Sequence, residues 1–431
     1  MRKNTFRRKK YFKMKSLKAI RLRIKINKLN LRRENKRNMR STREKETYKY
    51  EDLLFLKERN FYKNKKKDEK NLIINIPEIF SLQKKPNDVL KIIKRLVSCG
   101  LNNKVKELRL NYSNCKEMTV ETSLLVDIVV LNIEQYKLKH KIDFKINITV
   151  EKCSYIEEML KNTGLIKHLE FKSNEACSDR IVRLGFIKGE NNKKNSSEIS
   201  GNVIKFYDTC LKKHGFSLKK EGKQKLGYMI GEVLDNCYNH SGDFKSWYTI
   251  GYYTNDDKDI GECSIAIINF GDTVYEGIKK GTTENISLME NLAKKHDKLF
   301  LPNKWTRDNL YTLYSLQEGV SKMKGKDSGQ DRGQGTKNLI ESFQLLGNSF
   351  DKKCKPIMTI TTGNTHIIFD DRYKFKNRGD NIKVIAFNSD NDLNKRPDKE
   401  NVINISNKFP GVIISMKFYI DKDYIKGEME R

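Results

Sequence analysis

Three segments in the second half of the chain place polar side chains and glycines where they could bind a nucleotide. In the first, "GYMIGEVLDNCYNHSGD" (227–243), Glu232 and Asn236 are one helical turn apart, so their side chains meet on one face. A carboxylate can accept a proton from a nucleophile, and an amide oxygen one turn later can complete the ligand shell of Mg²⁺. Asn239 lies along the same edge. The alternative is that these side chains cap a neighbouring backbone.

The second and third segments are rich in glycine. "INFGDTVYEG" places Asn269, Gly271 and Gly277 at the end of a buried strand, where glycine lets a planar ligand approach the backbone. "GQDRGQGTKNLI" runs into a helix start, where backbone N–H groups and the helix dipole suit phosphates. Each segment alone is common, but their order and spacing together indicate a nucleotide site. The candidate ligands in the third segment are Arg332, Gly333, Gln334, Gly335 and Thr336.

A helix must carry the first segment and a sheet the second. Apolar residues beside Glu232 and Asn236 recur with a 3.6-residue period, at Leu226, Met229, Ile230, Val233, Leu234 and Cys237. We expect strands at 246–254, 263–271 and 411–420. "PIMTITTGNTHIIFD" (356–370) is expected to form a hairpin with Gly363 and Asn364 at its turn. Residues 371–409 have the composition of a polar insertion.

Together the three segments resemble the motifs of the histidine-kinase-like (GHKL, Bergerat-fold) ATPases over residues 201–420. "GEVLDNCYNHSG" is similar to the N box of anti-sigma-factor serine kinases, and "INFGDTVYEG" and "DRGQGTKNLI" resemble the two glycine boxes. The resemblance implies a two-layer α/β sandwich that binds ATP and Mg²⁺. It implies Glu232 as general base, Asn236 as Mg²⁺ ligand and 272–331 as an ATP lid. Asn269 stands where the family has an adenine-binding Asp, and an amide oxygen still accepts a hydrogen bond, without charge.

The first half of the chain alternates strands and helices from residue 71. This rhythm predicts a small α/β domain over 71–172, with Gly164 ending its last helix. With "MTVETSLLVD" opening a mostly buried helix at 119–138, the pattern resembles the STAS fold of anti-sigma-factor antagonists. We expect a polar linker at 173–200 and a short tail at 421–431.

Positive charge is concentrated at the N-terminus. Residues 1–70 hold 28 Lys and Arg against 8 acidic residues, which is most of the chain's net charge of +32. Such a basic arm can contact nucleic-acid phosphates, or it can be a disordered or loosely helical tail. The eight cysteines lack CxxC spacing, which favours reduced thiols in a cytoplasmic protein. No apolar run is long enough to span a membrane.

The sequence therefore predicts a cytoplasmic α/β protein that binds Mg-ATP and regulates a protein partner. It would act as a nucleotide-gated switch or as a serine/threonine kinase, and whether it is an enzyme stays open, as does a homodimer. Two alternatives remain. The first is a nucleic-acid-associated nucleotide sensor that uses residues 1–70, for example in defence against mobile DNA. The second is a degenerate ATPase fold kept as a scaffold.

Overall fold

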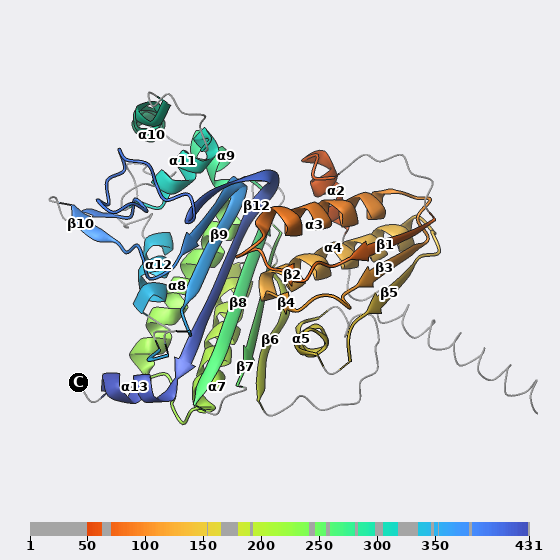
Figure 1. The fold of residues 1–431 in the computed structure, drawn as a ribbon, viewed down its shortest axis with the longest axis horizontal. Coiled ribbons are helices and arrows are strands. Elements are labelled where there is room, and N and C mark those ends of the chain that lie inside the picture. Colours follow the sequence, from red (N-terminus) through yellow and green to blue (C-terminus); the bar gives the residue numbers. More distant parts are fainter. Residues whose placement is uncertain are drawn as a thin grey trace, which may run out of the picture. The chain divides into compact units, whose positions relative to one another are not determined.

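The computed structural model describes a mixed α/β protein with one parallel and one antiparallel main sheet (Figure 1). The described residues belong to one compact unit, Tyr50–Arg431. Within them, no helix is long and apolar enough to cross a bilayer. They are residues 50–62, 70–152, 154–164, 180–189, 193–240, 246–255, 259–280, 283–297, 305–317, 335–345, 349–351, 353–378 and 382–429.

The N-terminal part is built on a three-stranded parallel sheet in the order β1-β3-β5. Strands and helices alternate along the chain as expected from residue 71, and Gly164 follows the last helix of this part. Two short parallel strands, β2 and β4, form a separate pair. The elements are β1 (Asn71–Asn75), β2 (Ile79–Phe80), α3 (Pro86–Leu101), β3 (Glu107–Asn111), β4 (Glu117–Met118), α4 (Val120–Lys139), β5 (Lys145–Thr149) and α5 (Tyr155–Thr163).

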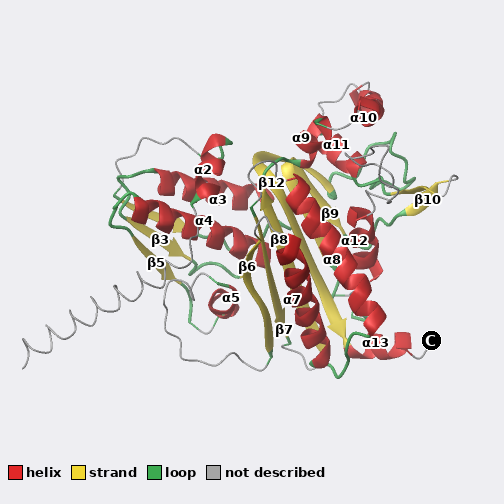
Figure 2. Ribbon diagram, turned by 180° about the vertical axis from the view of Figure 1, so that it is seen from behind, coloured by secondary structure: helices red, strands yellow, loops and turns green. Residues whose placement is uncertain are grey.

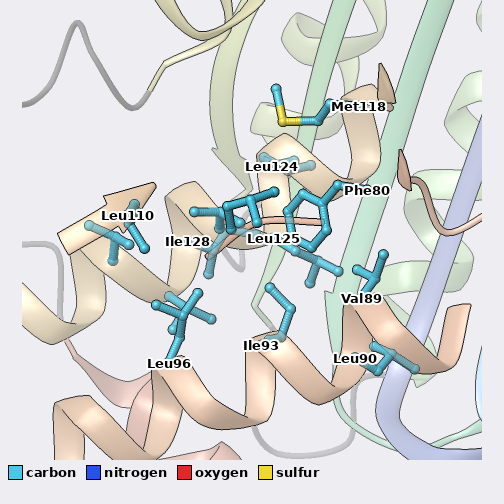
Figure 3. Close-up of a cluster of buried hydrophobic side chains, with 14 of the residues drawn as sticks. Phe80, Val89, Leu90, Ile93, Leu96, Leu110, Met118, Leu124, Leu125 and Ile128 are labelled. Carbon is cyan, nitrogen blue, oxygen red and sulfur yellow. The ribbon is translucent and has the colours of Figure 1, made fainter. Parts of the chain in front are cut away.

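Helix α4 is buried on nearly every side over its first fourteen residues, Val120–Ile133. Its Leu124, Leu125 and Ile128 pack among apolar side chains of α3, such as Val89 and Ile93 (Figure 3). Helix α4 also contacts β7, β8 and β12 of the second sheet. The buried residues of α4 lie on every side of the helix, so α4 is covered on every side, by α3 and by strands of the second sheet.

The second sheet has five strands in the order β6-β7-β8-β12-β9, and all neighbours are antiparallel. Its front face, defined by Ile265 and Ile267, shares a core with helices α7, α8 and α12 (Figure 2). Its rear face, defined by Ala266 and Ile268, shares a core with α3 and α4. The elements are β6 (Ile181–Gly189), α7 (Lys193–Lys212), α8 (Lys220–His240), β7 (Trp247–Thr254), β8 (Ile260–Phe270), α12 (Gly335–Leu345), β9 (Ile357–Phe369) and β12 (Val402–Asp421).

The expected two-layer sandwich is therefore incomplete as a description, because helices cover both faces of this sheet. The expected linker at 173–200 is also wrong in part. Residues 181–189 form β6, an edge strand of the sheet, and α7 begins at Lys193. Charged side chains such as Arg183 and Lys188 are usual on an edge strand, and they obscured the alternation of apolar residues.

The expected hairpin at 356–370 is wrong as well, because β9 runs straight through Gly363. The Gly363-Asn364 pair, which is typical of a hairpin turn, lies instead at a bulge between β9 and β12. Gly363 takes a positive φ of 54° there. A Cβ at Gly363 would lie 2.5 Å from an oxygen of Asp308, so glycine is required by space and by conformation.

Other predicted boundaries also move. Helix α2 (Glu51–Glu58) lies inside the expected basic arm, yet it buries Asp52, Leu53 and Leu56. The expected insertion at 371–409 includes the first residues of β12, and the expected tail holds α13 (Lys422–Met429). The same insertion contains two short paired strands, β10 (Lys376–Arg378) and β11 (Ile382–Val384).

Candidate functional site

Asn269 is the penultimate residue of β8 and the most informative polar side chain of the sheet. Alternation along β8 puts it on the front face with Ile265 and Ile267. The residue is 1 % exposed, and its side-chain Nδ2 has no hydrogen-bond partner among the described residues. An unsatisfied buried donor costs about 1–3 kcal/mol, so Asn269 Nδ2 is a candidate donor to a ligand.

The backbone after Asn269 turns sharply against the neighbouring strand. Gly271 has a φ of 148°, and Gly411 of β12 has a φ of 135° beside it. A Cβ at Gly411 would lie 2.0 Å from the backbone oxygen of Asn269, so only glycine allows this approach. The Val274 N–H then donates to Thr362 Oγ1 of β9 at 3.0 Å. The turn after Asn269 is thus held against β12 by the close approach at Gly411 and against β9 by the hydrogen bond to Thr362.

The front face next to Asn269 is a row of side chains from adjacent strands. Strand pairing places Trp247 on one side of Asn269 and Val412 on the other, with Thr362 beyond. Trp247 and Thr362 are both buried. Sequence reasoning passed over both residues, because an isolated Trp or Thr at a strand end carries no spacing signal.

Helix α8 carries Glu232 and Asn236, and both are half-buried. The stripe that includes Val233 and Cys237 packs in the front-face core, as the 3.6-residue period predicted. Helix α8 ends at His240, a few residues before β7 begins at Trp247, which pairs with Asn269. The C-terminal half of α8 and Asn269 therefore lie at the same end of the sheet. The Asn239 side chain is outside the described residues.

Helix α12 starts at this same end. Just after α12, Ser349 Oγ donates to Asp421 at 2.7 Å, and Asp421 pairs with Ile260, at the opposite end of β8 from Asn269. Helix α12 packs on α8 and spans roughly 16 Å at 1.5 Å per residue, so its N-terminus is directed back toward the Asn269 end. Its first residues are Gly335 and Thr336. Of the second glycine segment, 332–334 and the Thr336 side chain lie outside the described residues.

Gly277 does not lie at the strand end as expected, but inside helix α9 (Val274–Lys279). The helix is closed by a capping box. Thr273 Oγ1 accepts from the Glu276 N–H at 3.1 Å, and Glu276 Oε2 accepts from the Thr273 N–H at 3.0 Å. The T-x-x-E spacing is a known sequence signal for this cap, and it was available before the structure.

Part of the expected lid, 272–331, is packed into the protein, whereas most described residues of its helix α10 (Thr283–Asp297) are exposed or half-buried. The segment contains α9, α10 and α11 (Arg307–Ser315), and α11 buries every residue from Asp308 to Tyr314. Asn309 Nδ2 donates to the Asn364 carbonyl at 3.0 Å and contacts Thr365 Oγ1 at 2.9 Å. These contacts hold α11 against β9, so α11 could not swing open without unpacking a core.

No group of three His, Cys, Asp or Glu side chains in the described ranges could hold a metal ion. A Mg²⁺ ion bound through one amide oxygen, waters and substrate phosphates would not produce such a group. In comparisons with protein-family models, with curated proteins and with solved structures, the chain matches none.

Proposed function

We propose that the C-terminal part, from β6 to β12, binds Mg-ATP at the Asn269 end of the front face and acts as a regulatory module of the histidine-kinase-like ATPase type. The observation that carries this proposal is the buried, unpartnered Nδ2 of Asn269. It lies on the face covered by α8 and beside a glycine turn. The amide of an asparagine can both donate to and accept from one edge of adenine.

The neighbouring elements support this assignment. The half-buried Asn236 of α8 would contribute its side-chain oxygen to Mg²⁺. The N-terminus of α12 at Gly335 would direct its backbone N–H groups toward the phosphates. The order of elements also agrees with the resemblance noted in the sequence: N-box-like helix, two strands, glycine turn, second glycine segment, helix and two closing strands.

We propose two ways in which the bound nucleotide could act on a protein partner. It would either switch the binding of the partner or serve as the phosphate donor when this protein phosphorylates the partner. A hydroxyl oxygen of the partner would attack the γ-phosphorus of ATP, the bond from that phosphorus to the β–γ bridging oxygen would break, and ADP would leave. Glu232, one turn before Asn236, would accept the proton that a serine or threonine hydroxyl of the partner loses. The half-buried position of Glu232 on α8 suits this role, because the residue is partly exposed and is carried by a helix.

The test is equilibrium binding of ATP to the whole chain, with and without Mg²⁺. Wild type should bind with micromolar strength and require Mg²⁺. Asn236→Ala and Gly335→Val should weaken binding at least about tenfold, equivalent to roughly 1.4 kcal/mol. Asp235→Ala is the matched control, because Asp235 is the exposed neighbour of Asn236 on the same helix. Absence of nucleotide binding by wild type would refute the proposal and favour the scaffold alternative.

A second candidate function is nucleic-acid binding, and it is favoured by the positive charge at the N-terminus. Residues 1–49, which precede the compact unit, hold 21 Lys and Arg against 3 acidic residues. Nucleic-acid binding through such a segment should weaken steeply with salt and disappear on deletion of residues 1–49. Binding that persists after the deletion, or that ignores salt, would contradict this role.

A further inference from the structure

Helix α2 contacts the rear of the strand end whose front carries Asn269. Phe270, the next residue, points to the rear face, and its ring lies 6.5 Å from that of Phe55 in α2. Phe409 of β12 continues the cluster, with ring centroids 5.7 Å from Phe270 and 6.0 Å from Phe61. The segment 50–62 is thus packed directly behind the candidate nucleotide site.

An ion cluster joins the same segment to the turn after Asn269. The Glu276 carboxylate caps Thr273, accepts from Lys408 Nζ at 3.0 Å and forms an ion pair with Arg59, the residue that follows α2. Burial alone would raise the pKa of Glu276, but the Thr273 N–H, Arg59 and Lys408 outweigh it and lower the pKa to about 2. Glu276 is therefore ionised at every pH at which the protein would work.

We propose that the Glu276 cluster, composed of Arg59, Glu276 and Lys408, positions the turn from Gly271 to Thr273, so that the docking of α2 regulates the nucleotide site. The regulation of the nucleotide site rests on the proposed function, whereas the positioning of the turn does not. Glu276 and Arg59 would be positioning residues, since they act through the backbone of the turn. Helix α2 would thereby belong to the site, although more than 200 residues separate it from Asn269 in the sequence.

The geometry explains why one contact can carry this coupling. The Thr273 N–H is bonded to the same oxygen, Oε2, that pairs with Arg59. Loss of Arg59 leaves the Glu276 carboxylate bonded only to the Thr273 N–H and to Lys408, so its ion pair with the segment that carries α2 is gone. The cap and the turn should then loosen together. Burial raises the pKa of the nearby Asp308 carboxyl and the Glu276 charge raises it further, whereas Lys408 lowers it.

The experiment compares Arg59→Ala with Arg180→Ala in the whole chain. Arg180 also bridges the N-terminal part to the second sheet, through Glu158 at 2.8 Å. It precedes β6 at Ile181, which pairs with Thr254, at the end of β7 opposite to Trp247. Two readouts are measured: ATP affinity with Mg²⁺, and amide hydrogen exchange of residues 271–277 without nucleotide. Arg59→Lys tests rescue by a conserved charge.

We expect Arg59→Ala to weaken ATP binding about three- to fivefold, in the range of a partly buried surface ion pair, and to speed exchange over 271–277 by a similar factor. Arg59→Lys should restore most of both, and Arg180→Ala should change neither. If Arg59→Ala matches Arg180→Ala in both readouts, the inference is overturned while the proposed function can stand. If wild type binds no nucleotide, the proposed function fails, and unchanged exchange in Arg59→Ala would overturn the positioning as well.

Discussion

An asparagine amide at a buried strand end offers a donor and an acceptor a short distance apart. At position 269 the donor has no partner within the described part of the chain, although the residue is almost fully buried. A carboxylate there would only accept, whereas the amide can pair with a ligand edge that presents both kinds of group, as purine edges do. In the proposed function, Asn269 would therefore be a specific contact for a base rather than a weakened copy of an acidic one.

Asn269→Leu should separate binding from stability. We expect ATP affinity to fall at least about tenfold, because the base loses a pair of hydrogen bonds worth roughly 1–3 kcal/mol. The free energy of unfolding should stay level or rise, since an apolar side chain removes an unsatisfied buried donor. ATP titration and urea unfolding measure the two effects.

Asn132→Leu is the matched control for that experiment. The buried Asn132 amide is fully used, with Nδ2 donating to Asp52 at 3.1 Å and to the Ile128 carbonyl at 2.9 Å. This variant should lose about 1–3 kcal/mol of stability and keep its ATP affinity. A large stability loss in Asn269→Leu would show that Asn269 serves the fold rather than a ligand.

At the scale of elements, α4 is unusual because it carries a carboxylate into the core between two sheets. Glu121 is 1 % exposed, and Ser415 of β12 donates to its Oε2 at 2.8 Å. Burial raises the pKa of Glu121 above its usual value of 4.5, against the opposing effect of its hydrogen bonds. The charged form is therefore disfavoured by folding.

Glu121→Gln should change how stability depends on pH. A carboxyl group whose pKa is higher in the folded than in the unfolded state binds its proton more tightly when folded, so it costs stability as pH rises. The free energy of unfolding of the variant, relative to that of wild type, should thus increase as the pH rises from 4.5 to 8. Unfolding by urea at several pH values measures this.

The exposed Glu198 of α7 supplies the comparison, as Glu198→Gln should show no such trend. A stability difference between wild type and Glu121→Gln that is constant with pH would contradict the buried, proton-binding role of Glu121.

The whole molecule is held by a core that both halves share. Rear-face residues of the second sheet, among them Ile250 and Ile268, belong to one apolar cluster with Leu110 of β3 and Leu124 of α4. Domains that share so much apolar surface do not move independently. The expected arrangement of two domains joined by a polar linker is replaced by a single packed unit.

Leu124→Ala tests this unity. It should cost about 2–5 kcal/mol, the usual loss for truncating a buried leucine. Both tryptophans of the chain, Trp247 and Trp305, lie in the C-terminal half, so their fluorescence reports unfolding there. The fluorescence midpoint in urea should fall together with the circular dichroism midpoint.

The half-exposed Leu138, on the same helix α4, gives the control. Leu138→Ala should cost no more than about 0.5 kcal/mol. If Leu124→Ala leaves the tryptophan transition where it is in wild type, the two halves fold separately and the shared core is not cooperative.

The sequence by itself determined the elements whose burial has a simple period. Helix α8 shows its stripe at a 3.6-residue spacing, α4 its long run rich in Leu, Val and Ile, and β8 its apolar run up to Asn269. These patterns are local, because a helix or strand repeats its contacts every few residues along its own chain. They were enough to identify the residues of the candidate site that lie on α8 and β8.

Only the tertiary structure decided what meets at the site and what covers it. Three features depend on partners that are distant in sequence: the pairing of the polar edge strand β6, the bulge at Gly363 in β9, and the docking of α2. Whether the Asn269 amide finds a hydrogen-bond partner depends on every strand and helix around it. A period along one segment contains no information about such neighbours, since they are selected by packing and by hydrogen bonding across the fold.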